Sequence, residues 1–132
     1  MEEIATSFLI ASTNPRKLSE FYALVCNENV SNGLNSNHYL IIYRENLKIH
    51  FYKASMKHQG FYEGPSSVAL CFQKESSLEP LLKLKEWCKE LFSLGAEVLV
   101  EPKNEFFGAE AWMQDPEGNS FLLLVPLIAS IN

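Results

Sequence analysis

The chain has 132 residues, of which 47% are hydrophobic and 20% are charged, and its net charge is −5. These values are typical of one globular domain with its own core. The acidic balance argues against nonspecific nucleic-acid binding, which needs basic patches to displace counterions. The sequence has no apolar run of about 18 residues and therefore no candidate membrane span.

The start of the chain and its cysteines indicate the compartment. Residues 1–4 are acidic and lack the basic and then apolar layout of a signal peptide. The three cysteines, Cys26, Cys71 and Cys88, are odd in number and have no metal-like spacing. We therefore expect a cytoplasmic protein.

The first half begins with a predicted strand and a helix. Residues 8–11 form a short apolar strand, and Asn14 and Pro15 are suited to the N-cap and first position of a helix. Apolar side chains then recur at the spacing of one helical face. These residues are Leu18, Phe21, Tyr22 and Val25.

Further strands follow the first helix. We expect a weak strand around Val30, and two stronger strands at residues 39–43 and 47–52. Glu45 and Asn46 between the stronger strands suggest a hairpin turn. Residues 57–65 are predicted to form a connector.

The second half repeats this order. A strand at 68–72 precedes a helix that Ser76 or Ser77 should cap, with Pro80 in its first turn and Gly95 after its end. The predicted buried face of this helix consists of Leu81, Leu84, Cys88, Leu91 and Phe92. Three strands are predicted after it, at residues 97–100, 109–114 and 120–125.

The order of elements predicts a repeated unit. The first strands of the two halves begin near Ser7 and Ser67, sixty residues apart. A ferredoxin-like sandwich allows one strand after the second helix, whereas we count three. We therefore predict an α+β fold of two βαβββ modules, at about 4–56 and 66–127, within a single domain spanning 1–132.

A tight turn joins the last two predicted strands. Pro116 fixes its own φ and moves Asp115 away from helical geometry, while Gly118 and Asn119 tolerate positive φ. The apolar run 120–125 follows at once. This stretch resembles the closing hairpin of the vicinal-oxygen-chelate superfamily, which includes glyoxalase I, extradiol dioxygenases and bleomycin resistance proteins.

Other segments are similar to the same superfamily: the opening strand, turn and helix with Asn14, Phe21 and Tyr22, and the helix end at 94–98. The resemblance implies that the modules form a curved mixed sheet around a cup, with the helices outside. It also implies a homodimer.

The resemblance further implies four positions at which family members commonly carry metal ligands. They fall on Ser7, on Ser67 (or Ser66 after a one-residue slip), on His50 and on Leu122. A stable metal site needs about three or four strong donors. Hydroxyls are weak ligands and leucine is none, so we predict no metal and no other cofactor, and we doubt the metal-dependent activities of the family.

Strand alternation predicts which side chains face the cup. If Phe8 and Ile10 face a helix, small residues of the opening strands and larger ones opposite them line a partly apolar pocket. The residues that should face it are Ser7, Leu9, Ala11, Lys48, His50, Tyr52, Ser67, Ala69, Cys71, Leu122 and Leu124. Those predicted to bind a ligand are Ser7, His50, Tyr52, Ser67, Cys71, Trp112 and Leu122.

Each of these residues also has a plain structural interpretation. His50 is a hydrogen-bond partner or general base, or a satisfied strand histidine. Tyr52 is a ligand contact or packing, and Cys71 is a nucleophile or a small apolar residue. Trp112 shares a face with Gln114, and either stacks on a ligand or belongs to the core.

Residues 106–108 and the three histidines each have two interpretations. Residues 106–108 form a rim over the pocket or a hydrophobic corner. His38 and His58 complete a three-histidine metal site with His50 only if the fold gathers residues that have no motif spacing.

Three functions follow, and no catalytic residue is assigned. The leading hypothesis is metal-free binding of a small, partly apolar molecule, as in sequestering proteins of the bleomycin-resistance type. The alternative is a lyase, isomerase or dioxygenase-type enzyme, with unusual metal ligands (His38, His50, Glu110) or with His50 as base. The third is an interaction module whose cup is filled by side chains.

Overall fold

The computed structural model describes residues 5–43, 47–53 and 68–128. The chain divides into two compact units, residues 1–65 and 66–132, which we call module one and module two. The predicted connector at 57–65 lies outside the described residues. That the modules make up a single domain stays a prediction. Within the described ranges, no helix is long and apolar enough to cross a membrane.

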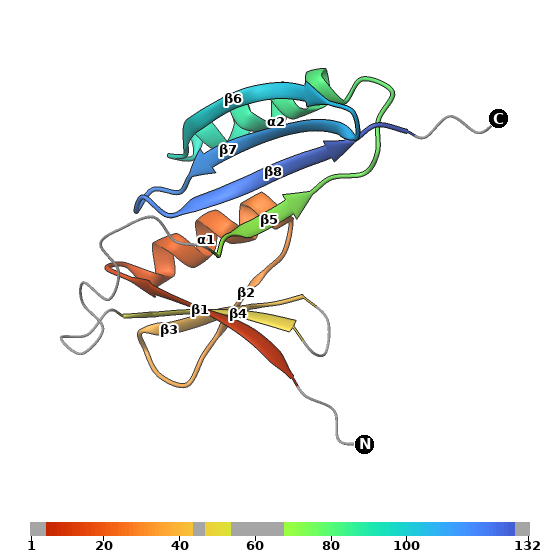
Figure 1. Cartoon of the computed structure of the whole chain (residues 1–132). Helices are drawn as coiled ribbons and strands as arrows, with labels where there is room; N and C mark the ends of the chain where they lie inside the picture. The colour runs from red at the N-terminus through yellow and green to blue at the C-terminus, as the bar shows by residue number, and fades with distance from the viewer. Residues whose placement is uncertain (1–4, 44–46, 54–67, 129–132) are drawn as a thin grey trace. The chain divides into compact units, whose positions relative to one another are not determined.

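Module one has the predicted order of one strand, one helix and three strands (Figure 1). Its sheet has the strand order β1-β4-β3-β2, in which β1 and β4 run parallel and the other pairs are antiparallel. Helix α1 packs on one face of this sheet. The elements are β1 (Thr6–Ser12), α1 (Pro15–Cys26), β2 (Val30–Asn32), β3 (His38–Ile42) and β4 (Leu47–Lys53).

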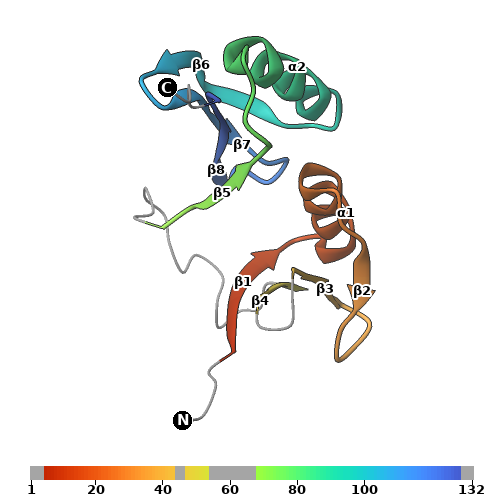
Figure 2. The same ribbon diagram turned by 90° about the vertical axis from the view of Figure 1, so that its right-hand side faces the viewer.

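Module two repeats this plan with the strand order β5-β8-β7-β6, again with one parallel pair, β5 and β8. Figure 2 shows α2 lying along one face of this sheet. The elements are β5 (Leu70–Gln73), α2 (Pro80–Ser93), β6 (Glu97–Glu105), β7 (Gly108–Gln114) and β8 (Ser120–Pro126). The prediction of two βαβββ modules is confirmed.

The core of module one lies between α1 and the sheet. All four predicted helix residues are buried, and the Tyr22 ring stacks on Phe51 with centroids 5.7 Å apart. The start of α1 follows from its cap, because the Asn14 side chain accepts the Lys17 N–H at 3.2 Å and Pro15 occupies the first helical position. Sequence periodicity therefore located both the helix and its buried face.

The core of module two differs from the prediction at two of the five positions, since Leu81 is only half-buried and Phe92 is exposed. Leu84, Cys88 and Leu91 are buried as expected, but Phe92 is 65% exposed and Trp87 is buried in its place. Positions 84, 87, 88 and 91 form the narrow stripe of a 3.6-residue repeat, and Phe92 lies at its edge. The assignment of Phe92 to the buried face was wrong.

The predicted serine cap of α2 was also wrong. Glu79 is the N-cap residue and makes no side-chain capping bond. The Ser77 hydroxyl accepts the Glu79 N–H at 3.0 Å, just before the helix begins. Pro80 decides the boundary, since its fixed φ and missing N–H suit the first helical position.

The turn between β7 and β8 is organised by a buried carboxylate. Asp115 is 3% exposed, and its Oδ1 accepts the N–H groups of Glu117 at 2.8 Å and Asn119 at 3.0 Å. Its Oδ2 accepts the Asn119 side-chain amide at 2.7 Å. Gly118 takes a φ of +90°, which few other residues adopt. The predicted hairpin is confirmed, and Asp115 and Asn119 are structural.

Candidate functional site

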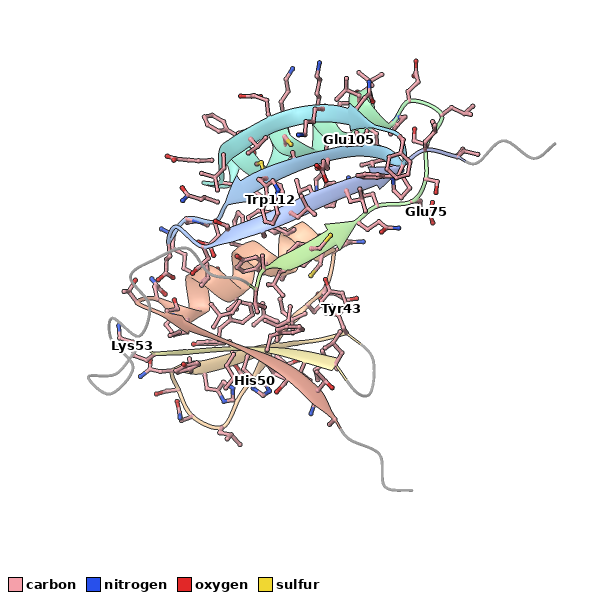
Figure 3. The ribbon with its side chains drawn as sticks, viewed as in Figure 1. Tyr43, His50, Lys53, Glu75, Glu105 and Trp112 are labelled. Atoms are coloured by element: carbon pink, nitrogen blue, oxygen red, sulfur yellow. The ribbon has the colours of Figure 1, made fainter. Side chains whose placement is uncertain are left out.

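Each sheet has one face covered by its helix and one open face. In module one, Phe8 pairs with the buried Ile49, so both point toward α1. The alternate residues Leu9 and His50 pair with each other on the opposite face, and Leu9 is 67% exposed. Figure 3 shows His50 on the side of the sheet away from α1. The predicted alternation of β1 and β4 is therefore confirmed.

The strand register identifies every side chain of this face, because directly opposed residues of neighbouring strands share a face. We call this set the module-one open face. It consists of Ser7, Leu9, Ala11, Ser31, His38, Leu40, Ile42, Lys48, His50 and Tyr52. Three of the predicted ligand-binding residues, Ser7, His50 and Tyr52, therefore lie on the same face of the sheet. Ser67 and His58 lie outside the described residues.

Two histidines form a hydrogen-bonded pair on the module-one open face. The Nε2 atom of His38 lies 2.8 Å from Nδ1 of His50, and the rings stack with centroids 5.0 Å apart. The backbone N–H of Leu34 donates to Nδ1 of His38 at 2.9 Å. Gly33 makes room for this ring, since a Cβ there would lie 2.3 Å from His38 Nδ1. The backbone at Gly33 and Leu34 thus fixes the position of the His38 ring, and His38 in turn fixes His50.

The Leu34 donor determines which nitrogens of the neutral pair carry protons. Nδ1 of His38 accepts the backbone N–H, so the proton of His38 is on Nε2. That proton is donated to Nδ1 of His50, which leaves the proton of His50 on its own Nε2. His50 therefore offers a donor, not a lone pair, beyond the histidine pair.

The surroundings keep His50 neutral. Burial is the largest cause that lowers its pKa, and the neighbouring His38 and Lys48 lower it further. The hydrogen-bond chain acts in the same direction, because a second proton on either ring would remove an acceptor that the chain uses. At neutral pH His50 is consequently a directional donor beside the cationic Lys48.

Module two has an open face of different chemistry. Trp112 pairs with Leu122 and Gln114 with Ser120, so the register places Trp112 and Gln114 on the face opposite α2. Cys71 also pairs with Leu122 and therefore lies on this face. Figure 3 labels Trp112 on its strand. We call this set the module-two open face. It includes Cys71, Gln73, Glu97, Val100, Lys103, Glu110, Trp112, Gln114, Ser120, Leu122 and Leu124.

Cys71 has the properties of a small packing residue more than those of a nucleophile. Cys71 is exposed as a residue, but its thiol is partly buried, and this burial together with the smaller effect of the Glu110 carboxylate raises the pKa of the thiol. The thiolate is the reactive form, so a raised pKa reduces reactivity at neutral pH. Cys71 is therefore suited to contacting a ligand without reacting with it.

The described residues at the family's metal positions do not make up a set of metal donors. Leu122 has no donor atom and lies between Cys71 and Trp112 in the register. A metal on Nε2 of His38 would require the proton on Nδ1, where the Leu34 N–H already points. Among the described residues no three His, Cys, Asp or Glu side chains gather as a metal site.

A separate groove of about 530 Å³ lies beside the start of α2 and was not predicted. Leu78, Lys85, Glu105 and Leu127 are among its lining residues. It includes none of the predicted ligand-binding residues. The corner at 106–108 borders it through Gly108, and Phe106 there is 93% exposed.

The comparisons with known proteins agree with this architecture. A glyoxalase-related enzyme from Fulvimarina pelagi is 11% identical, with a TM-score of 0.71 over all of this chain and 94% of that one. A glyoxalase/bleomycin resistance protein/dioxygenase family enzyme from Burkholderia phytofirmans PsJN is 16% identical, with a TM-score of 0.68 over 95% of this chain and all of that one. The chain has the glyoxalase/bleomycin-resistance/dioxygenase fold.

A third protein of this fold is an antibiotic binding protein, TnmS3 from Streptomyces sp. CB03234. It is 17% identical, with a TM-score of 0.63 over 95% of this chain and 97% of that one. No protein-family model and no curated protein matches the sequence. The predicted resemblance to the vicinal-oxygen-chelate superfamily is confirmed at the level of the fold, which hosts many chemistries.

Proposed function

We propose that this protein binds a small, partly apolar molecule without the help of a metal. The observation that carries the proposal is the module-one open face, where exposed aliphatic side chains surround an oriented hydrogen-bond donor. Leu9 is 67% exposed and Ile42 is 44% exposed. A ligand that covers them gains about 25 cal/mol for each Å² of apolar surface removed from water.

The module-two open face supports the same class of ligand. Trp112 is half-buried beside the half-buried Leu122, and its ring offers a surface for a planar or apolar group. Gln114 and Glu110 on the same strand supply polar contacts. Binding sites for small molecules commonly combine such apolar walls with a few polar groups. The antibiotic binding protein of the same fold is consistent with this use.

Binding is favoured over catalysis by His50 for a specific reason. A general base must direct a lone pair toward its substrate. In the neutral pair the lone pair of His50 accepts the His38 proton, and the remaining nitrogen carries hydrogen. The pair is arranged to donate a hydrogen bond to a ligand. It is not arranged to remove a proton from one.

A thermal-shift screen of hydrophobic, cationic, anionic and aromatic compounds tests the proposal. A compound present at 100 times its Kd stabilises the folded state by about 2.7 kcal/mol, which raises Tm by several degrees. We expect such hits to weaken when Leu9 is replaced by Glu or Trp112 by Ala. A screen without hits across these classes would contradict the proposal.

Elemental analysis of protein purified without chelator tests the metal-free part. We expect far less than one metal ion per chain. Stoichiometric zinc, nickel, iron or manganese would contradict this part and revive the enzyme alternative. The homodimer and the cytoplasmic location belong to the same proposal. Light scattering after size-exclusion chromatography checks the first, and cell fractionation checks the second.

A further inference from the structure

We infer that the module-one open face selects ligands that carry a carboxylate on an apolar body. This inference rests on the proposed function, because it names the ligand class for that face. The nearby donors are the Lys48 ammonium and the His50 Nε2–H. Both belong to β4 and are two residues apart on one face, roughly 7 Å along the strand. A single carboxylate can accept from both groups, since the lysine side chain is long and flexible.

The charges of this face favour an anion although the whole chain is acidic. Of the ten residues that make up the module-one open face, none is an Asp or Glu. Its titratable groups are Lys48, His50 and Tyr52 on β4 and His38 on β3. The two ion pairs seen in the described part of the chain are Arg16–Glu20 and Lys103–Glu105, so no described carboxylate neutralises Lys48. A ligand carboxylate would gain a charge-assisted hydrogen bond there.

Aliphatic side chains border these donors. His50 lies between Leu9 of β1 and Leu40 of β3, and Lys48 lies between Ser7 and Ile42. A carboxylate held by Lys48 and His50 would therefore place the rest of its molecule against leucine or isoleucine. A long-chain or aromatic acid fits this arrangement better than a small polar acid.

The histidine pair is built for one orientation of His50. Gly33 leaves space for the His38 ring, the Leu34 N–H fixes its tautomer, and His38 then fixes the tautomer of His50. His38 is thus a positioning residue, and His50 is the group that contacts the ligand. An amine would meet the Nε2–H and the ammonium as two like donors, which disfavours it.

Three matched probes test the inference with the full chain at pH 7.5. They are 4-phenylbutyrate, its methyl ester and 4-phenylbutylamine, which share an apolar body and differ in the head group. Isothermal titration calorimetry should give an affinity for the acid about tenfold above that for the ester or amine, since one such charge-assisted bond contributes about 1.4 kcal/mol. Amide chemical shifts should change at residues 48–50 upon binding.

Variants identify the groups responsible. Lys48→Gln should reduce the affinity for the acid about five- to tenfold and leave the ester unaffected. Lys17→Gln, which removes an exposed charge from α1, is the matched control and should change neither the affinity for the acid nor that for the ester. His50→Gln keeps an N–H donor and should retain more affinity than His50→Leu. His38→Phe should lower the affinity for the acid, because His50 loses the partner that orients it, although Lys48 stays in place. Heteronuclear NMR spectra check that each variant is folded.

Each result has a definite meaning. Preference for the acid that Lys48→Gln abolishes supports the inference. If the ester or amine binds as tightly as the acid, or if Lys48→Gln has no effect, the inference is overturned while small-molecule binding stands. If no probe binds and the wider screen also gives no hit, the inference and the proposed function both fall.

Discussion

The two modules have the same backbone plan and different open faces. In each, the first strand runs parallel to the last, and the helix covers a set of fully buried apolar side chains. Phe51 in module one and Phe121 in module two are both 0% exposed. The difference lies on the other side of each sheet. The comparison shows that the buried face specifies the fold, while the open face is free to differ between the modules.

The open faces differ in what they offer a ligand. Module one presents Lys48 and the donor of His50 beside exposed aliphatic groups. Module two presents Trp112, Leu122 and the carboxylate of Glu110. The first suits an anionic head group and the second suits an aromatic or apolar surface. A repeated unit has therefore produced two chemically distinct surfaces.

The largest expected effect compares the buried faces with the open ones. Phe51→Ala and Phe121→Ala should each lower the free energy of unfolding by about 3–5 kcal/mol, because each leaves a cavity in a closed core. Leu9→Ala and Leu122→Ala, the open-face controls, should each cost about 1 kcal/mol or less. Urea unfolding measures all four. An open-face variant as costly as a core variant would break the comparison.

A second prediction concerns the turn of module two. Asp115→Ala should lower the free energy of unfolding by about 2 kcal/mol, since three donors lose a buried carboxylate acceptor. Asp115→Asn keeps one oxygen and should cost less. Glu90→Ala, an exposed change on α2, is the control and should stay within about 0.5 kcal/mol. Equal stability of Asp115→Ala and the control would refute the structural role.

The histidine pair predicts a pH dependence for module one. Burial, His38 and Lys48 lower the pKa of His50, so the unfolded chain binds more protons than the folded chain in this range. The free energy of unfolding should therefore fall as the pH decreases below about 6.5, the ordinary histidine pKa. Urea unfolding at pH 7.5 and 5.5 measures this fall, which should be smaller in His50→Leu. An unchanged fall would assign it to other groups.

The smallest effects should come from the exposed ion pairs, of which the described residues show one in each module. Arg16 and Glu20 are 75% and 55% exposed, and Lys103 and Glu105 are 54% and 34% exposed. Arg16→Ala or Lys103→Ala should change the free energy of unfolding by about 0.5 kcal/mol or less. Thermal unfolding at low and high salt checks this. A loss above 1 kcal/mol would show that one pair is part of a larger network.

Much of the candidate site could be predicted because alternation is a local property. The spacing of Ser7, His50 and Tyr52 was enough to place them on one face of their strands. In the sequence His38 was recognised only as a possible metal ligand. Its contact with His50 requires the β3–β4 register and the space above Gly33, and single-strand patterns contain neither.

The sequence by itself determined the order of elements, the closing turn at Asp115 and the two-residue alternation of the strands. These features depend on neighbours in the chain, whose spacing and turn chemistry act over a few residues. The tertiary structure alone decided that Trp112 lies on an open face, that Trp87 is buried where Phe92 was expected, and that His38 orients His50. Those outcomes depend on how distant strands and helices pack, and that packing is a sum of contacts between residues far apart in the chain.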